Sequence, residues 1–251
     1  MAGAPEVYYF TDHYVNYPAV LALRPARIEG MRNLGLIGGL GPGATVHYYR
    51  ELAKAQAGEL LVIHADMDRV LGEVQRGDRI GLARYFARLI ERLAHGGAEL
   101  AVISAVAPHI CIRELEKISA LPLVNIIDEV GAEIRSRGYK RVALFGTRFV
   151  VESRMFGMLE GIEVLVPDQV ETIHQAYMQT VEGAREGRAV LSRVAHELSV
   201  DAIVLAGTDL SLVFDETNTN FVHVDCAKIH IQAILHKLGT VHSNTDFHRE
   251  K

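Results

Sequence analysis

The feature that most constrains the fold is a regular alternation of short apolar runs and amphipathic stretches that begins near residue 33. The apolar runs are nearly continuous, which is typical of strands that are buried on both faces. The stretches between them carry apolar residues at helical spacing, as in residues 80–95. Strands that alternate with helices in this way predict parallel sheets with helices on both faces.

The expected strands are residues 34–38, 60–64, 100–104, 123–126, 141–146, 162–166, 202–206 and 221–224. The expected helices are residues 44–57, 80–95, 128–137, 151–160, 169–184, 189–198 and 227–238. Because the pattern restarts after residue 122, we expect an α/β protein of two similar parallel-sheet domains with a cleft between them.

The expected domains divide the chain unequally. The first comprises residues 31–122 plus 222–251, because the last strand and helix are expected to return to it. The second comprises residues 123–221. Residues 1–30 show no clear period, and we interpret them as an N-terminal extension that packs on the body or on a partner subunit, or as a segment ahead of a functional start at Met31.

Composition and charge argue against several classes of protein. The chain carries 26 Lys and Arg against 31 Asp and Glu, a formal charge of −5, whereas nucleic-acid-binding proteins are usually basic. No run approaches the roughly 20 apolar residues of a membrane-spanning helix. The two cysteines, Cys111 and Cys226, are too few for a disulfide framework, which favours a reducing, cytoplasmic setting.

A glycine-rich string, Gly38-Gly-Leu-Gly-Pro-Gly-Ala-Thr45, lies between the first expected strand and the first helix. Its amides and the helix N-terminus suit an anion. The string also fits a dinucleotide fingerprint loosely, with Asp66 as the acidic partner. However, Pro42 removes one amide donor and Asp66 lies farther along than is usual. The sequence therefore favours a carboxylate-binding turn, or a merely tight turn, over a nucleotide site.

The string His64-Ala-Asp-Met-Asp68 follows the second expected strand and gathers ionisable groups. A metal site would need a third ligand that the sequence does not nominate, so no metal is expected. Substrate contacts or solvated loop residues remain as the two interpretations of these side chains.

Two further polar strings follow strands, one in each half: Ser104-Ala-Val-Ala-Pro-His109 and Ala206-Gly-Thr-Asp-Leu210. Ligands bind α/β sheets beyond the carboxyl ends of the strands, so both strings are candidates for one site. His109 is either an acid/base, since its ordinary pKa lies near neutrality, or a helix-start residue. Thr208 and Asp209 either bind a carboxylate and act as a base, or cap and turn the chain.

The order of these motifs resembles the cofactor-independent aspartate/glutamate racemase family. The resemblance rests on residues 36–45 followed by Tyr48 and Tyr49, on Gly96–Ala98, and on residues 144–149, 162–168, 204–209 and 225–230. It covers roughly residues 33–239. It implies two similar α/β domains with an active site between them, small amino-acid or carboxylate substrates, no cofactor and commonly a homodimer.

The resemblance also implies a mechanism with two cysteines, one on each face of the substrate. The matching positions here are Ala105 and Gly207, and the Asn and Thr beside the first cysteine are replaced by Val106 and Ala107, whereas His109 is kept. Alanine and glycine cannot accept a proton, so racemisation by two thiols is not expected. Neither Cys111 nor Cys226 stands at a matching position.

We therefore expect a divergent family member that binds a small amino acid or carboxylic acid between its domains, as an isomerase- or lyase-type enzyme. The expected catalytic residues are His109, Asp209 and Asp66; the expected substrate-binding residues are Gly41, Thr45, His64, Ser104, Ala105, Thr147, Gly207 and Thr208. The alternative is a catalytically inactive homologue that binds a metabolite or acts as a scaffold. A nucleotide-binding protein is the least favoured reading.

Overall fold

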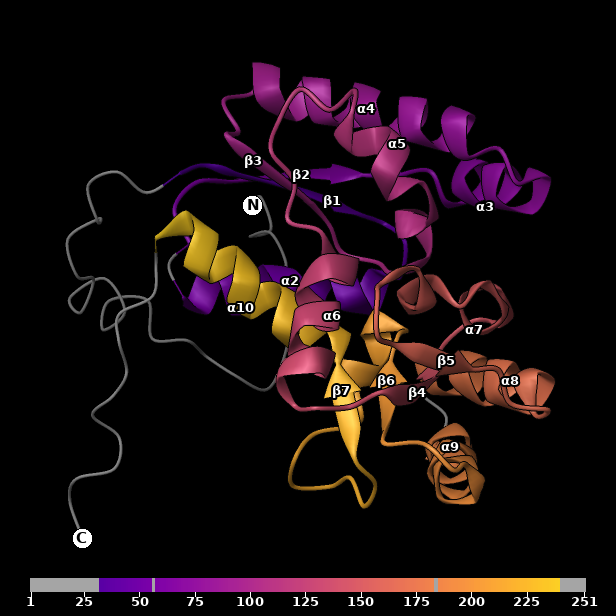
Figure 1. Cartoon of the computed structure of the whole chain (residues 1–251). Helices are drawn as coiled ribbons and strands as arrows, with labels where there is room; N and C mark the ends of the chain where they lie inside the picture. The colour runs from indigo at the N-terminus through magenta and orange to yellow at the C-terminus, as the bar shows by residue number, and fades with distance from the viewer. Residues whose placement is uncertain (1–31, 56, 183–184, 240–251) are drawn as a thin grey trace, which may run out of the picture.

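The computed structural model describes residues 32–55, 57–182 and 185–239 (Figure 1). The expected N-terminal extension and the tail after residue 239 lie outside the described residues. In chain order the strands and helices are β1 (Leu34–Gly38), α2 (Pro42–Lys54), β2 (Leu60–His64), α3 (Met67–Arg76), α4 (Arg79–His95), β3 (Leu100–Ile103), η1 (Ala107–Cys111), α5 (Ile112–Glu116), α6 (Ile126–Ser136), β4 (Arg141–Phe145), α7 (Arg148–Ser153), η2 (Met155–Met158), β5 (Glu163–Leu165), α8 (Val170–Val181), α9 (Arg185–Glu197), β6 (Ala202–Leu205), η3 (Thr208–Leu212), β7 (His223–Asp225) and α10 (Cys226–Leu238), where η marks a 3-10 helix.

Two parallel sheets confirm the expected α/β class. The first has the strand order β2-β1-β3, and the second has the order β5-β4-β6-β7. In the first sheet Leu34 is in register with Leu60 on one side and Leu100 on the other. All strand pairs are parallel, so the carboxyl ends of the strands in each sheet lie at one edge.

Helices cover both faces of each sheet (Figure 1). One face of the first sheet packs against α4 and α5, and the other packs against α2 and α10. In the second sheet, α6 lies on one face and the pair α8 and α9 on the other. The side chains of β4 alternate between these two cores, as parallel strands buried on both faces require.

The expected strand at 123–126 is reduced to one bridge. Leu123 pairs in parallel with Ala101 at the edge of the first sheet, and α6 begins at Ile126. Asn125 ends the extended segment because its side-chain oxygen accepts a hydrogen bond of 3.0 Å from the Ile127 amide, an N-cap that starts the helix. The apolar run is therefore divided: Leu123 and Val124 are extended at the edge of the first sheet, and Ile126 begins the helix.

The last strand lies in a different place from the one expected. β7 pairs with β6 in the second sheet, whereas the sequence analysis assigned residues 222–251 to the first domain. The helix that follows does pack on the first sheet, because Ala227, Ile231 and Ile234 of α10 share a core with β1 and β3. The chain thus changes halves between β7 and α10.

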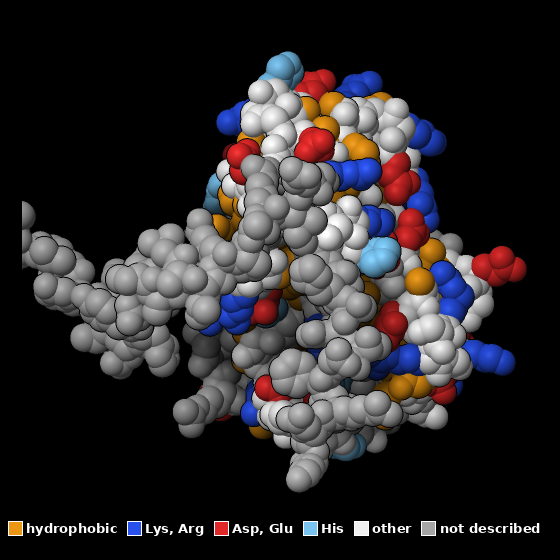
Figure 2. All heavy atoms as spheres, turned by 90° about the vertical axis from the view of Figure 1, so that its left-hand side faces the viewer, with side chains coloured by type: hydrophobic (Ala, Val, Ile, Leu, Met, Phe, Trp, Pro, Cys, Tyr) orange, Lys and Arg blue, Asp and Glu red, His pale blue; other side chains and the backbone are white. Residues whose placement is uncertain are grey.

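The surface in Figure 2 mixes Lys and Arg with Asp and Glu side chains over the described part of that face. Among the described residues, no helix combines the length and the apolarity that crossing a membrane requires.

Candidate functional site

The carboxyl ends of strands from the two sheets meet at Ser104 and Thr208. The Thr208 hydroxyl donates a hydrogen bond of 3.0 Å to the Ser104 carbonyl, and the Ser104 hydroxyl donates one of 3.3 Å to the Ile37 carbonyl. Ser104 and Thr208 are both buried. The ends of β1, β3 and β6 are therefore joined in the protein interior, at the place where α/β sheets bind ligands.

The glycine-rich turn between β1 and α2 closes on Thr45. The Thr45 hydroxyl accepts a hydrogen bond from the Gly39 amide and donates one to the Gly41 carbonyl, each 3.0 Å long. Gly41 has a φ of 130°, which L side chains rarely adopt. Thr45 thus holds the turn in shape, and its hydroxyl is engaged by the backbone of the turn.

Asp209 lies against the same turn from the opposite half. Its Oδ1 accepts a hydrogen bond of 2.7 Å from the Ala44 amide in the first turn of α2. A Cβ atom at Gly41 would lie 2.6 Å from Asp209 Oδ2, and one at Gly43 would lie 2.9 Å from Oδ1. The absence of side chains at these two glycines is what allows the carboxylate to approach the helix N-terminus.

The pKa of Asp209 is raised above its ordinary value. Burial is the largest cause, because it disfavours the charged form, and the hydrogen bonds from Ala44 and Tyr177 offset it in part. A carboxyl group with a raised pKa is suited to exchange a proton with a bound ligand.

Tyr177 of α8 completes the surroundings of Asp209. Its hydroxyl donates a hydrogen bond of 3.3 Å to Asp209 Oδ2. Its ring also lies over Gly207, where a Cβ atom would come within 2.2 Å of Tyr177 Cε2. Gly207 has φ −94° and ψ 111°, which any residue can adopt. The aromatic ring, and not the backbone, therefore requires glycine at position 207.

His109 is buried in η1, beside the end of β3. Its Nδ1 lies 2.8 Å from the Ala105 carbonyl. A carbonyl oxygen only accepts, so Nδ1 carries the hydrogen and Nε2 keeps its lone pair in the neutral ring. Burial lowers the pKa of His109 to about 4, so the ring is neutral at pH 7.

A second buried histidine packs beside the first. The rings of His109 and His230 meet edge to face, with centroids 6.3 Å apart. His230 Nε2 donates to the Val124 carbonyl over 2.9 Å, and its Nδ1 accepts from the Tyr48 hydroxyl over 3.0 Å. Burial lowers the pKa of His230 to about 3, so this ring is also neutral at pH 7.

The other expected site residues are distributed around this centre. The His64 ring borders the glycine turn, because a Cβ atom at Gly39 would lie 2.8 Å from it. Asp66 is an exposed N-cap whose carboxylate accepts from the Arg69 amide over 3.1 Å. Thr147 caps α7 through a 3.4 Å hydrogen bond from the Val150 amide. In the described structure no hydrogen bond joins Asp66 or Thr147 to His109 or Asp209.

Neither cysteine has a thiol suited to act as a nucleophile or a base. Cys111 and Cys226 are free and buried, and burial raises the pKa of Cys111 to about 12 and that of Cys226 well above its ordinary value. The thiolate, which is the reactive form, is therefore suppressed in both. Within the described ranges, His, Cys, Asp and Glu side chains form no group of three or more that could hold a metal ion.

Sequence reasoning did not select Tyr177, the residue that contacts both Gly207 and Asp209. Tyr177 occupies an apolar position of an amphipathic helix, and its core-facing position gives no signal of a hydroxyl that meets a carboxylate. The glycine at position 207 is the sequence signal that a large side chain packs against the backbone there.

Known proteins share both sequence and fold with this chain. The family model for Asp/Glu/hydantoin racemases matches residues 37–234. An aspartate racemase homologue from Pyrococcus horikoshii is 22% identical with a TM-score of 0.70, over 83% of this chain and 100% of that one. A putative Asp/Glu racemase from Yersinia pestis is 24% identical with a TM-score of 0.68, over 83% of this chain and 99% of that one.

A third solved structure is more distant. Glutamate racemase from Francisella tularensis, crystallised in complex with D-glutamate, is 13% identical with a TM-score of 0.58, over 85% of this chain and 84% of that one. At these identities the likeness to solved structures establishes a shared fold.

Proposed function

This chain belongs to the Asp/Glu/hydantoin racemase family, and on that premise we propose that it binds a small amino acid or carboxylic acid where the strand ends of its two halves meet. The observation that carries the proposal is the placement of Asp209, which reaches from η3 to the N-terminus of α2. Amides and hydroxyls of the glycine turn lie beside this carboxylate, and Thr208 next to it bonds the end of β3. Such a mixture suits a ligand that carries a carboxylate.

We propose further that the protein does not racemise through two thiols. The family's two cysteines would stand at positions 105 and 207, which hold alanine and glycine. The Tyr177 ring fills the space that a side chain at position 207 would need. The cysteines that are present have raised pKa values, which leaves little thiolate at neutral pH.

In this proposal His109 and Asp209 carry the acid/base chemistry of an isomerase or lyase. Neutral His109 offers the lone pair of Nε2 to a proton, while its Nδ1–H is fixed on Ala105. Asp209 supplies the second proton-exchanging group. Thr45, Thr147 and Thr208 hold the ligand carboxylate, for which Thr45 and Thr208 exchange their present hydrogen bonds to the Gly41 and Ser104 carbonyls. His64 borders the turn and assists the proton transfer. Asp66 can assist only if its carboxylate gives up the hydrogen bond from the Arg69 amide that caps α3.

The experiment that tests this proposal starts from ligand discovery. Amino acids, dicarboxylates and hydroxy acids are screened by thermal shift against the purified protein, and each ligand found is incubated in D2O and followed by NMR. We expect a ligand to be converted or to exchange a C–H proton, and we expect His109→Gln and Asp209→Asn to abolish that change. His95→Gln, on the exposed end of α4, is the matched control.

Aspartate and glutamate provide the negative arm of the same experiment. Deuterium incorporation at their α-carbon is expected to be absent with the wild-type protein. Exchange that persists in both His109→Gln and Asp209→Asn would contradict the exclusion of thiol chemistry. Exchange that is lost in His109→Gln would instead identify His109 as the base.

One observation favours a second candidate, a catalytically inactive binding protein. The hydroxyls of Thr45 and Thr208 and the carboxylate of Asp209 all have partners within the chain. An inactive homologue would bind ligands in the thermal-shift screen but leave them chemically unchanged in D2O. The same experiment therefore distinguishes the enzyme from the inactive binding protein.

We also propose a homodimer that works in a reducing, cytoplasmic setting. Two free cysteines without a disulfide support the setting. Exposed apolar side chains at Val46, Tyr49 and Leu212 support an association surface. Sedimentation equilibrium tests the dimer by comparing the association constants of the wild type and Tyr49→Lys. A charge at an apolar interface should lower the constant of the variant.

A further inference from the structure

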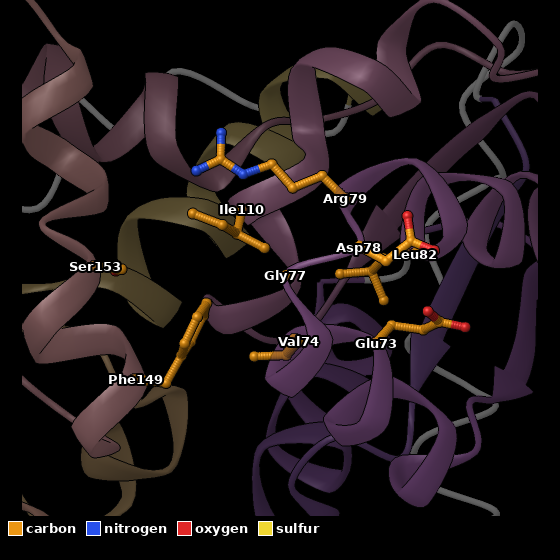
Figure 3. Close-up of a pocket in the computed structure, with 9 residues that line it drawn as sticks. All are labelled: Glu73, Val74, Gly77, Asp78, Arg79, Leu82, Ile110, Phe149 and Ser153. Atoms are coloured by element: carbon orange, nitrogen blue, oxygen red, sulfur yellow. The ribbon is translucent and has the colours of Figure 1, made fainter.

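A pocket of about 200 Å³ lies where α3 and the start of α4 face α7, so that both halves of the molecule contribute to it (Figure 3). Val74 and Leu82 come from the first half, and Phe149 and Ser153 come from the second. The pocket is lined by Glu73, Val74, Gly77, Asp78, Arg79, Leu82, Ile110, Phe149 and Ser153. None of these residues belongs to the cluster of Asp209, Tyr177 and the glycine turn.

The interior of this pocket is apolar. Val74, Leu82, Ile110 and Phe149 form its walls, and Ile110 packs against the cores of both halves. A cavity of about 150 Å³ lined by apolar side chains is large enough to hold benzene. The pocket therefore has room for a single six-membered ring or a branched aliphatic group with a few further atoms.

Three of the four polar side chains at the rim of the pocket already have partners within the chain. Glu73 forms an ion pair of 3.0 Å with Arg76, the Asp78 carboxylate accepts from the Gly81 amide over 2.8 Å, and the Ser153 hydroxyl donates to the Val150 carbonyl over 2.8 Å. The Arg79 guanidinium has no ion pair or side-chain hydrogen bond with any described residue. Among the described residues, Arg79 is therefore the charged group of the pocket that is available to pair with a ligand.

The orientation of these side chains sets the sign of the charge that the pocket favours. In Figure 3 the Arg79 guanidinium extends over the side of the pocket where Ile110 lies, whereas the carboxylates of Glu73 and Asp78 point to the opposite side. A guanidinium presents paired N–H donors that match the two oxygens of a carboxylate.

We propose that this pocket is a second binding site, for a small apolar carboxylate. The ring or branched body of the ligand packs between Val74, Leu82, Ile110 and Phe149, and its carboxylate pairs with Arg79. Because Ile110 directly follows His109 in η1, a ligand in this site contacts the same turn that holds the proposed base. Because both halves line the site, the ligand also bridges them.

The test uses three probes of one shape and different charge: phenylacetate, phenylacetamide and 2-phenylethylamine. Binding is followed by calorimetry and by the isoleucine methyl signals of the selectively labelled protein. We expect phenylacetate to shift the Ile110 methyl signal and to bind about tenfold more tightly than the neutral amide, the gain of one charge-assisted pair. The amine should bind most weakly.

Two variants locate the charge and the cavity. Arg79→Gln should weaken phenylacetate about tenfold and leave phenylacetamide unchanged. Arg76→Gln, which changes the neighbouring exposed arginine at the end of α3, is the matched control and should change neither affinity. Ser153→Phe fills the pocket from α7 and should abolish both, with a circular dichroism spectrum that shows the fold intact.

This proposal is overturned if phenylacetate does not bind, if the acid and the amide bind equally, or if Arg79→Gln leaves the affinity for the acid unchanged. Asp209→Asn distinguishes this site from the one under Proposed function, and it should leave phenylacetate binding intact. If Asp209→Asn abolishes phenylacetate binding, the ligand occupies the strand ends, so the second site is wrong while the proposed function stands.

Discussion

The carboxylate of Asp209 accepts a 2.7 Å hydrogen bond from the Ala44 amide, although the two residues lie 165 positions apart in the chain. The contact places a side chain of the second half at the N-terminus of a helix in the first half. A helix N-terminus attracts negative charge, so a carboxylate of the protein itself stands where an anionic ligand is commonly found.

We expect Asp209→Ala to lower the free energy of unfolding by about 2 kcal/mol, because it leaves the buried Ala44 amide and Tyr177 hydroxyl without their acceptor. Asp209→Asn keeps an oxygen that can accept from Ala44 and should lose less. Urea unfolding measures both. Asp168→Ala, at an exposed position, should stay within about 0.5 kcal/mol of wild type; a loss as large as that of Asp209→Ala would contradict the role of the contact.

We expect Gly207→Ala and Gly207→Cys to be destabilising by roughly 1–3 kcal/mol, since the new Cβ atom overlaps the Tyr177 ring. Adding Tyr177→Ser should recover part of that loss, and Tyr177→Phe should not, because the ring remains. A double-mutant cycle from unfolding curves gives the coupling energy. Gly157→Ala is the control, because its Cβ atom meets nothing closer than 3.5 Å. Additive effects at positions 207 and 177 would show that the ring is not what excludes a side chain.

We expect the protein to lose stability on mild acidification. Burial lowers the pKa of His109 to about 4 and that of His230 to about 3, whereas an unfolded histidine titrates near about 6.5. The unfolded chain therefore takes up protons first as the pH falls below about 6.5, and each histidine costs on the order of 2 kcal/mol by pH 5. This stability is present above the unfolded pKa and lost below it.

Urea unfolding at pH 7.5 and pH 5.0 measures that acid effect. His109→Gln and His230→Gln should each shrink the difference between the two pH values, even where they lower stability at pH 7.5. His95→Gln, at an exposed position, should keep the full difference. An unchanged difference in both buried-site variants would assign the acid effect to other groups.

We expect Thr208→Val to lower the free energy of unfolding by about 1 kcal/mol, because it removes the hydroxyl that joins η3 to the end of β3 and takes this donor from the Ser104 carbonyl. Thr208→Ser keeps the donor and should restore most of the loss. Thr180→Val is a useful comparison, since that hydroxyl bonds the Ala176 carbonyl within its own helix. Hydrogen exchange of the strand-end amides should rise in Thr208→Val and not in Thr180→Val.

The pattern of apolar residues predicted the α/β class and most strands correctly, because buried parallel strands are short apolar runs. It was wrong where contacts with distant segments determine whether a run forms a strand and which sheet it joins. Residues 123–126 are as apolar as a strand, yet the Asn125 cap ends the extended segment after one bridge and starts α6 at Ile126. β7 pairs with β6, and no feature of residues 223–225 by themselves specifies which sheet they join.

The site followed a similar division. The rule that ligands bind beyond strand ends selected Ser104 and Thr208, which the structure brings within hydrogen-bonding distance. It could not select Tyr177, because a residue on a core-facing helix position meets Asp209 only through tertiary packing. The sequence also does not show which candidate groups are already hydrogen-bonded within the chain: the Asp66 carboxylate, for example, caps α3.

The chain passes between its two halves at two places. One passage lies at Val124, the other between β7 and α10, and the His230 ring joins them by its hydrogen bond to the Val124 carbonyl. A single buried ring therefore contacts both crossings of the chain, and a substitution that removes the His230–Val124 hydrogen bond disturbs the two crossings together.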